Sequence, residues 1–116
     1  MVNPKRGELQ LVLGQKTLTG RVTLDGIIRI ENALGMGIVQ ATKRLSDGDL
    51  TTTQVMAILQ PIIKGGGNDI TEKDMRTLVW DAGLTDAIRE CGKVLIFALS
   101  AGKDDEGNEE MAEVNS

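Results

Sequence analysis

The chain has 116 residues, of which 41% are hydrophobic and 26% are charged, a composition typical of a single globular domain. It contains one cysteine and no histidine. This excludes an intrachain disulfide, a Ser-His-Asp or Cys-His catalytic set and any histidine-bearing zinc site. The longest apolar run, residues 94–99, is far shorter than the roughly 20 residues that a membrane-spanning helix needs. We therefore expect no membrane partner and a chain suited to a reducing cytoplasm.

Charge is unevenly distributed along the chain. Residues 1–102 carry 12 basic and 11 acidic side chains, whereas residues 103–116 carry Lys103 and six acidic side chains. This pattern predicts one globular domain over residues 1–102, followed by a disordered acidic tail over residues 103–116. The nearly neutral domain lacks the excess of Lys and Arg that nucleic acid binding requires, so no nucleic acid partner is expected.

Near the N-terminus the pattern predicts a β-hairpin. Leu9, Leu11 and Leu13 alternate with other residues over residues 8–13, as in a half-buried strand. Gly14-Gln15 fits a two-residue type II′ turn, and residues 16–22 form the returning strand. Because two strands alone are only marginally stable, the hairpin must pack on the helices that follow.

Two short helices are predicted next. Thr23 is a suitable N-cap for a helix that ends at Leu34, before Gly35. Its apolar face is expected to hold Leu24, Ile27, Ile28 and Leu34, with Ile30 outside it. A second helix follows, with an apolar stripe at Ile38, Ala41 and Leu45.

Two capping boxes mark the starts of the third and fourth helices, at Thr51 with Gln54 and at Thr71 with Asp74. Pro61 predicts a kink or an early stop in the third helix. Residues 65–68 are expected to form a flexible connector. The apolar stripes are expected at Val55, Ile58, Leu59 and Ile62, and at Met75, Leu78, Val79 and Ala82.

The last predicted helix runs over residues 84–102, with an apolar stripe at Ile88, Cys91, Leu95 and Leu99. Together these elements predict an α+β fold, predominantly helical, in which an N-terminal β-hairpin packs on about five short helices. Cys91 is interpreted as a buried structural residue, the alternative being a nucleophile.

The sequence does not favour a calcium site, a phosphate-binding loop or DNA binding. The loops at residues 46–49 and 67–69 lack the first ligand of a calcium-binding EF-hand, and the glycines at 65–67 lack the Lys that follows a phosphate-binding loop. Helices at residues 54–64 and 71–82 are compatible with helix-turn-helix DNA binding, but the second has a local charge of about −1. We expect no enzyme activity, no catalytic residue, no cofactor and no metal.

Several short segments within residues 4–102 have a distinctive order and spacing. They are Lys5-Arg6-Gly7-Glu8, Thr23-Leu24-Asp25-Gly26, Ile30-Glu31-Asn32-Ala33-Leu34-Gly35, residues 45–49, residues 64–71 and Gly83-Leu84. In these segments the chain resembles the small tail protein family of gene transfer agents and siphophage-like prophages. That family is labelled both tail tube protein and tail assembly chaperone. Pro61 and the long acidic tail depart from the family pattern.

The resemblance implies a role in building a phage-like tail in the cytoplasm of the bacterial host. The implied role is that of a tail assembly chaperone, whose partners are the tape-measure protein, other tail proteins and further copies of itself. Met36, Met56 and Met75 are candidate contacts because methionine adapts to varied apolar partners. The alternatives are a tube or terminator subunit that stays in the virion tail, and a small helix-turn-helix DNA-binding regulator.

Overall fold

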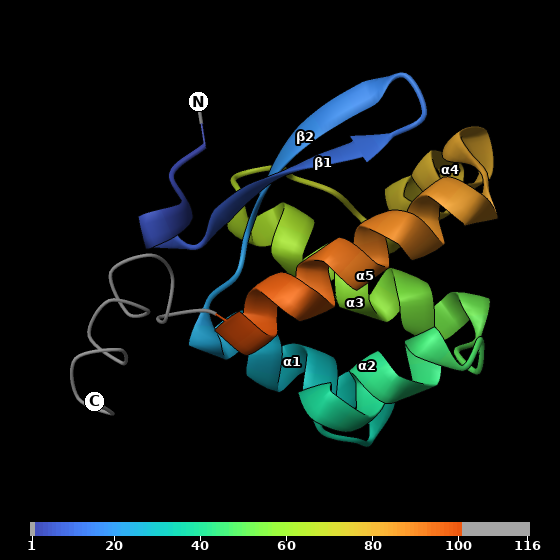
Figure 1. Cartoon of the computed structure of the whole chain (residues 1–116). Coiled ribbons are helices and arrows are strands. Elements are labelled where there is room, and N and C mark those ends of the chain that lie inside the picture. The colour runs from blue at the N-terminus through green and yellow to red at the C-terminus, as the bar shows by residue number, and fades with distance from the viewer. Residues whose placement is uncertain (1, 101–116) are drawn as a thin grey trace.

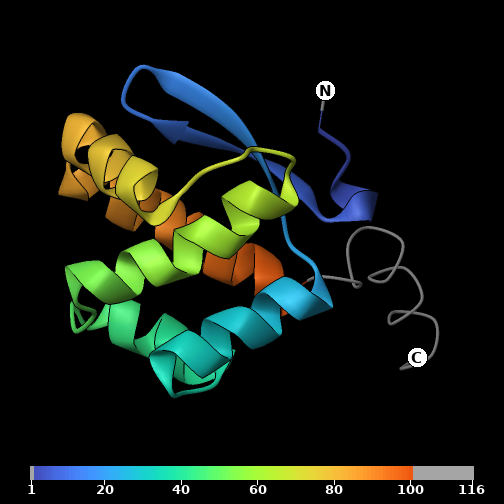
Figure 2. The same ribbon diagram turned by 180° about the vertical axis from the view of Figure 1, so that it is seen from behind.

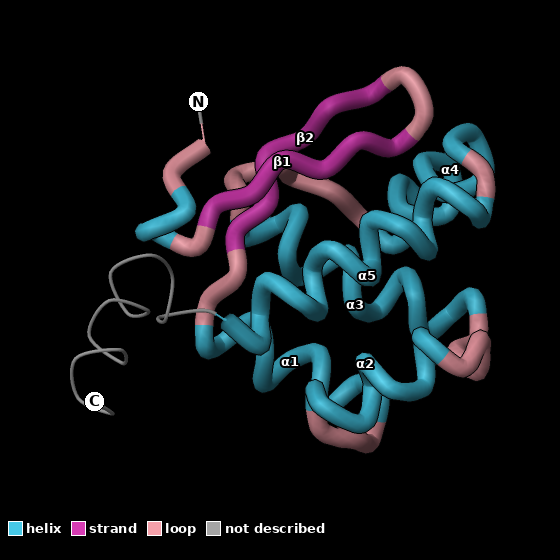
Figure 3. The backbone as a smooth tube through the Cα atoms, viewed as in Figure 1, coloured by secondary structure: helices cyan, strands magenta, loops and turns pink. Residues whose placement is uncertain are grey.

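The computed structural model describes residues 2–100. A short 3-10 helix, η1 (Pro4–Arg6), precedes a hairpin made of β1 (Glu8–Leu13) and β2 (Lys16–Arg21). Five helices follow: α1 (Leu24–Leu34), α2 (Ile38–Ser46), α3 (Thr52–Gly65), α4 (Glu72–Ala82) and α5 (Leu84–Ser100). Figure 3 shows this sequence of elements, which confirms the predicted α+β class with its N-terminal hairpin. The predicted disordered tail, residues 103–116, lies outside the described residues.

The elements form three layers (Figure 1). α3 and α5 pack together in the middle, the hairpin lies on one side of them, and α1 and α2 lie on the other. The view from behind in Figure 2 shows the same order, with α4 beside the tip of the hairpin. The core is aliphatic, as the near absence of aromatic residues predicts. Its largest fully buried apolar side chains are Leu11, Leu13, Ile30, Val55, Ile58, Leu59, Ile62, Ile63, Met75, Val94 and Leu95.

The predicted hairpin is confirmed with its two-residue turn, and its second strand ends at Arg21, one residue earlier than expected. Leu13 pairs with Lys16 across a two-residue turn, and β1 buries Leu9, Leu11 and Leu13 on one face. Gly14 has a φ of 65°, and no residue other than glycine has a positive φ among those described. This combination fits a type II′ turn, in which only the first turn residue is left-handed.

Both predicted capping boxes are present. The Gln54 amide donates to Thr51 Oγ1 at 3.1 Å, and the Thr51 amide donates to Gln54 Oε1 at 3.0 Å. At α4 the Asp74 amide donates to Thr71 Oγ1 at 3.1 Å, and the Thr71 amide donates to Asp74 Oδ2 at 2.9 Å. That hydrogen bond from the Thr71 backbone lowers the pKa of the Asp74 carboxyl.

The predicted buried face of α1 is half right, since Leu34 is buried and Ile27 packs partly buried against the core. Ile30, which was placed outside the stripe, is fully buried, whereas Leu24 and Ile28 are 73% and 45% exposed. The helix instead buries Gly26, Ile30 and Leu34, which are spaced four residues apart. α1 packs on α3, and a Cβ at Gly26 would make an ordinary contact with Ile62 Cδ1 at 3.6 Å, so packing against α3 rather than the apolar pattern alone sets the rotation of α1.

The predicted stripe of α5 is half right. Cys91 and Leu95 are fully buried, but Ile88 and Leu99 are 45% and 46% exposed. The buried face also carries small side chains, because α5 packs between neighbours on several sides. Its buried residues are Ala87, Glu90, Cys91, Val94, Leu95 and Ala98.

The early stop predicted at Pro61 does not occur, since α3 continues to Gly65. A proline in a helix removes one backbone hydrogen bond and costs about 3 kcal/mol. Ile62 and Ile63, which follow Pro61, are both fully buried. Burying two such side chains stabilises the fold by about 3–6 kcal/mol, enough to offset the proline.

The glycines at the end of α3 form a close contact with the hairpin, rather than the flexible connector expected. A Cβ at Gly65 would lie 2.8 Å from the Arg21 carbonyl oxygen, and one at Gly66 would overlap the Thr19 carbonyl oxygen. Asn68 Nδ2 then donates to the carbonyl oxygens of Thr19 at 2.8 Å and Ile63 at 3.0 Å. Backbone of α3 and backbone of β2 therefore meet directly, which only glycine permits at this position.

This contact predicts that Gly66→Ala lowers the free energy of unfolding by about 1–3 kcal/mol, because the added methyl group forces the two backbones apart. Urea unfolding followed by circular dichroism measures the change. Gly37→Ser is a matched control, since a Cβ at Gly37 meets nothing closer than Glu31 Oε2 at 3.6 Å. Equal stability of the two variants would contradict the contact.

Candidate functional site

Two kinds of chemical site can be examined within residues 2–100, a metal site and the Cys91 thiol. Within this part of the chain no group of three or more His, Cys, Asp and Glu side chains is placed to hold a metal ion. The described helices also include none that is long and apolar enough to cross a membrane. Cys91 is fully buried, and burial raises the pKa of its thiol to about 12. Two hollows on the surface flank α4 and are the candidate sites.

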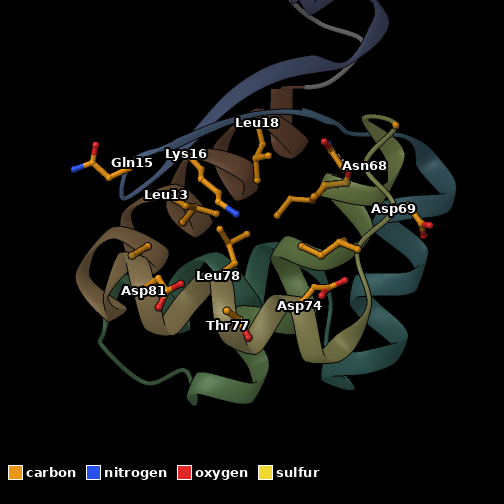
Figure 4. A pocket seen from close by; sticks show the side chains of 14 residues that line it. Leu13, Gln15, Lys16, Leu18, Asn68, Asp69, Asp74, Thr77, Leu78 and Asp81 are labelled. Carbon is orange, nitrogen blue, oxygen red and sulfur yellow. Dashed lines mark hydrogen bonds between the residues drawn. The ribbon is translucent and has the colours of Figure 1, made fainter.

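The first surface is a cleft of about 710 Å³ between the hairpin tip and α4, called here the hairpin–α4 cleft (Figure 4). Leu13, Leu18 and Leu78 converge on it from both walls (Figure 4). Its complete lining is Leu13, Gln15, Lys16, Leu18, Ile63, Gly67, Asn68, Asp69, Ile70, Asp74, Thr77, Leu78, Asp81 and Ala82. It thus combines an apolar floor with three exposed carboxylates and one ammonium group.

Two carboxylates of α5 hold the hairpin wall of this cleft in place. Glu90 Oε1 accepts a hydrogen bond from the Val12 amide at 2.7 Å, and Asp86 Oδ2 accepts one from the Gly14 amide at 3.1 Å. Arg89 donates to both carboxylates, at 3.1 Å to Asp86 and 3.3 Å to Glu90. Lys93 donates to Glu90 Oε1 at 2.9 Å. We call these six residues the carboxylate clamp: Val12, Gly14, Asp86, Arg89, Glu90 and Lys93.

The geometry of the clamp follows from the periods of a helix and a strand. Val12 forms a non-hydrogen-bonded pair with Thr17, so its amide points to the free edge of β1. Two residues of a strand span about 6.8 Å and four residues of a helix span about 6 Å. Acceptors four residues apart on α5 therefore match donors two residues apart on the hairpin.

Glu90 is charged although it is only 2% exposed. Burial by itself raises the pKa of its carboxyl, but hydrogen bonds from Lys93, the Val12 amide and Arg89 together outweigh burial and lower the pKa. The charged carboxylate is thus the form that the folded protein prefers. The sequence analysis missed this residue, because a single Glu on an amphipathic helix looks like an ordinary surface charge.

The second surface is an apolar groove of about 430 Å³ on the other side of α4, called here the Trp80 groove. It is lined by Thr52, Met56, Arg76, Val79, Trp80, Gly83 and Leu84. Trp80 is 86% exposed and Leu84 is 50% exposed. Sequence reasoning missed Trp80 as a site residue, although one signal was available: it lies outside the apolar stripe of α4.

The three candidate methionines occupy different environments. Met56 is partly buried and lines the Trp80 groove. Met36 is partly buried against the core at the turn between α1 and α2. Met75 is fully buried, so it is not accessible to a partner in this conformation. Only Met56 therefore belongs to either of the two surfaces around α4.

The helix pair considered for DNA binding corresponds to α3 and α4. Of the basic residues on α4, Arg76 is paired with Glu72 at 3.0 Å. Asp74 and Asp81 line the cleft beside the same helix. Carboxylates at this face repel phosphate groups, which weighs against the DNA-binding alternative.

The clamp predicts a specific pH dependence. Because folding lowers the pKa of Glu90, its contribution to stability is fully present above the pKa of the unfolded chain and is lost as pH falls through the folded pKa. At neutral pH, Glu90→Gln should lower the free energy of unfolding by roughly 1–3 kcal/mol. Between neutral pH and about pH 3, below the ordinary pKa of Glu, the difference from the unmodified protein should shrink.

Urea unfolding at several pH values measures this effect, with Glu72→Gln as control because Glu72 lies in an exposed ion pair. Such pairs contribute about 0–1 kcal/mol, so the control should stay close to the unmodified protein. The role assigned to Glu90 is wrong if Glu90→Gln follows the same pH dependence as the unmodified chain.

Burial of Cys91 predicts that its thiol resists alkylation in the folded protein. At pH 8, iodoacetamide should modify it at least about tenfold more slowly than in denaturant, because the thiolate is the reactive form. Mass spectrometry of timed samples follows the reaction. Equal rates in the folded and unfolded chain would restore Cys91 as a candidate nucleophile.

Comparison with known proteins identifies one family. Residues 6–101 match the protein-family model described as phage tail tube protein, GTA-gp10. Neither the curated proteins nor the solved structures give a match. The match covers most of the chain and confirms the resemblance to gene transfer agent tail proteins. The protein therefore belongs to the GTA-gp10 family of phage tail tube proteins.

Proposed function

We propose that the protein is a non-enzymatic tail assembly chaperone that binds the tape-measure protein in the cytoplasm of the bacterial host. On this proposal it keeps the tape-measure protein available until tube subunits polymerise around it. The observation that carries the proposal is the Trp80 groove, in which an 86% exposed tryptophan lies beside Leu84 and Met56.

The groove has the properties of a site for an apolar helix. Tryptophan is enriched among the residues that dominate binding energy at interfaces, and exposed apolar patches of this kind mark interaction sites. Met56 adds a side chain that adapts to different apolar partners. The groove is formed by α3, α4 and the start of α5, so a helix of the tape-measure protein can place one apolar face against it.

The environment of the hairpin also supports a chaperone over a tube subunit. A tube wall made of subunits needs strand edges that can pair with a neighbour. Here the free edge of β1 is occupied at Val12 by Glu90. The outer edge of β2 is occupied at Thr19 by Asn68, and Gly65 lies against the carbonyl of Arg21. Neither strand is therefore free along its length.

A structural subunit of the tail tube is the second candidate, because the description of the family names a tail tube protein. The two candidates differ in where the protein is found. Mass spectrometry of purified particles should detect the protein at stoichiometry comparable to other tail proteins if it is a tube or terminator subunit. Its absence from finished particles, together with its presence in assembling cells, is expected for a chaperone.

The groove predicts a graded loss of tape-measure binding. Trp80→Ala and Leu84→Ser should each weaken capture of the co-expressed tape-measure protein at least about tenfold, as central apolar contacts do. Pulldown after co-expression detects the complex, and a titration with the purified proteins measures the loss of affinity for the tape-measure protein. Val39→Ala is the matched control, since Val39 is 71% exposed but lies on α2, away from the groove.

Two results contradict the two parts of this proposal, the chaperone assignment and the choice of the Trp80 groove as the binding surface. If the unmodified chain captures no tape-measure protein, the chaperone assignment is wrong. If it captures the protein but Trp80→Ala and Val39→Ala behave alike, the assignment stands and the groove is not the binding surface.

A further inference from the structure

Basic side chains without an ion-pair partner gather where η1, the end of β2 and the end of α3 meet. Arg21 Nε donates to the Arg6 carbonyl oxygen at 2.8 Å, and a Cβ at Gly65, next to Lys64, would lie 2.8 Å from the Arg21 carbonyl oxygen. We call Lys5, Arg6, Arg21 and Lys64 the basic corner. None of these four side chains forms a salt bridge within residues 2–100.

Two carboxylates lie beside the basic corner and balance only part of its charge. Glu8 pairs with Arg21 in the register of the hairpin, and Asp69 follows Asn68, which bonds to the Thr19 carbonyl of β2. Helix α1 adds one charge of each sign in its first two turns. Four cations against two carboxylates leave the corner with a net charge of +2, which attracts an acidic segment.

Helix α5 carries the chain to this same corner. It runs antiparallel to β1, because Glu90 contacts Val12 and Asp86, four residues earlier, contacts the turn that follows β1. Four residues of a helix span about 6 Å and two residues of a strand about 6.8 Å. Continued for two more steps, this match brings Ala98 level with Glu8 at the start of β1. Figures 1 and 2 agree, since α5 ends near the start of α1, on the side of the molecule where η1 lies.

The sequence that follows α5 is strongly acidic. Residues 103–116 carry Lys103 and six carboxylates, a net charge of 1 − 6 = −5. The carboxylates are those of Asp104, Asp105, Glu106, Glu109, Glu110 and Glu113. Asp104 comes four residues after Ser100, so at about 3.6 Å per residue its backbone reaches up to about 14 Å from the end of α5. Opposite charges therefore meet at one side of the molecule, joined by a short connection.

From this arrangement we propose that the acidic segment, residues 104–113, docks on the basic corner of its own chain and shields the corner from other acidic partners. A short connection gives the segment an effective concentration in the millimolar range, so contacts too weak to join separate molecules suffice. The docking involves neither the Trp80 groove nor the tape-measure protein. It is therefore independent of the chaperone function and is tested on the purified full chain alone.

Carbodiimide cross-linking tests the docking, because this reagent joins a carboxylate to a lysine amine that touches it. In about 0.01 M salt, Lys5 and Lys64 should cross-link to residues 104–113 at least about tenfold more than Lys73 does. Lys73 is the matched control, since it is also exposed and in no salt bridge within the described residues, but lies on α4. Mass spectrometry of the cross-linked peptides measures the ratio. In about 1 M salt the preference should disappear, because the Debye length falls to about 3 Å.

An equal mixture of ¹⁵N-labelled and unlabelled chain distinguishes docking within a chain from docking between chains. Cross-linked peptides should carry a single isotope, whereas peptides of mixed isotope in the same yield overturn the proposal. Equal cross-linking of the corner lysines and Lys73 in low salt overturns it as well.

A second measurement does not depend on lysine reactivity. Neutralising the start of the acidic segment, by Asp104→Asn with Asp105→Asn and Glu106→Gln, should shift the amide NMR signals of Arg6 and Arg21 and leave that of Lys73 in place. Unchanged signals at the basic corner contradict the docking.

Discussion

The hydrogen bond between the buried Glu90 carboxylate and the Val12 amide fixes the hairpin to the helical body. A two-stranded hairpin has little stability of its own, so its position depends on contacts of this kind. Asp86 extends the contact to the turn at Gly14, and Arg89 links the two carboxylates. On the other strand, Gly66 and Asn68 join the end of α3 to the backbone of β2. The wall of the hairpin–α4 cleft is a consequence of this double attachment.

Most of the local structure could be predicted from the sequence, because local rules determine it. The two capping boxes need only residues three apart, and the alternation of Leu9, Leu11 and Leu13 needs only one strand. The rotation of a helix is different, because its neighbours decide it. Ile30 is buried and Ile28 is exposed because of the way α1 packs on α3, a relation that involves residues far apart in sequence.

The same distinction between local patterns and packing explains which parts of the candidate sites could be predicted from the sequence. The cleft joins the hairpin tip, the loop before α4 and α4 itself, so no pattern along the chain could have predicted it. Met56 was identified by its residue type and does line the Trp80 groove, whereas Met75 has the same type and fills the core. Trp80 is the clearest surface feature of the fold, yet it has no motif around it. Its exposure becomes evident only once the apolar stripe of α4 is known.

The two surfaces around α4 suit the demands of tail assembly in the GTA-gp10 family. One is apolar and has an exposed aromatic side chain, and the other is acidic around an apolar floor. Because they lie on different sides of one helix, a partner on one surface leaves the other accessible. On the chaperone function proposed above, such separate surfaces would let the protein hold one partner while another approaches.

The partial covering of both hairpin edges has a further consequence for aggregation. Unpaired strand edges are the usual starting point of cross-β aggregation in crowded solutions. Glu90 occupies the edge of β1 at Val12, Asp86 accepts from the turn at Gly14, and Asn68 occupies the edge of β2 at Thr19, so this fold blocks part of each edge without adding more strands. A second copy that approached either strand edge would meet helical side chains before it met a continuous row of free backbone groups.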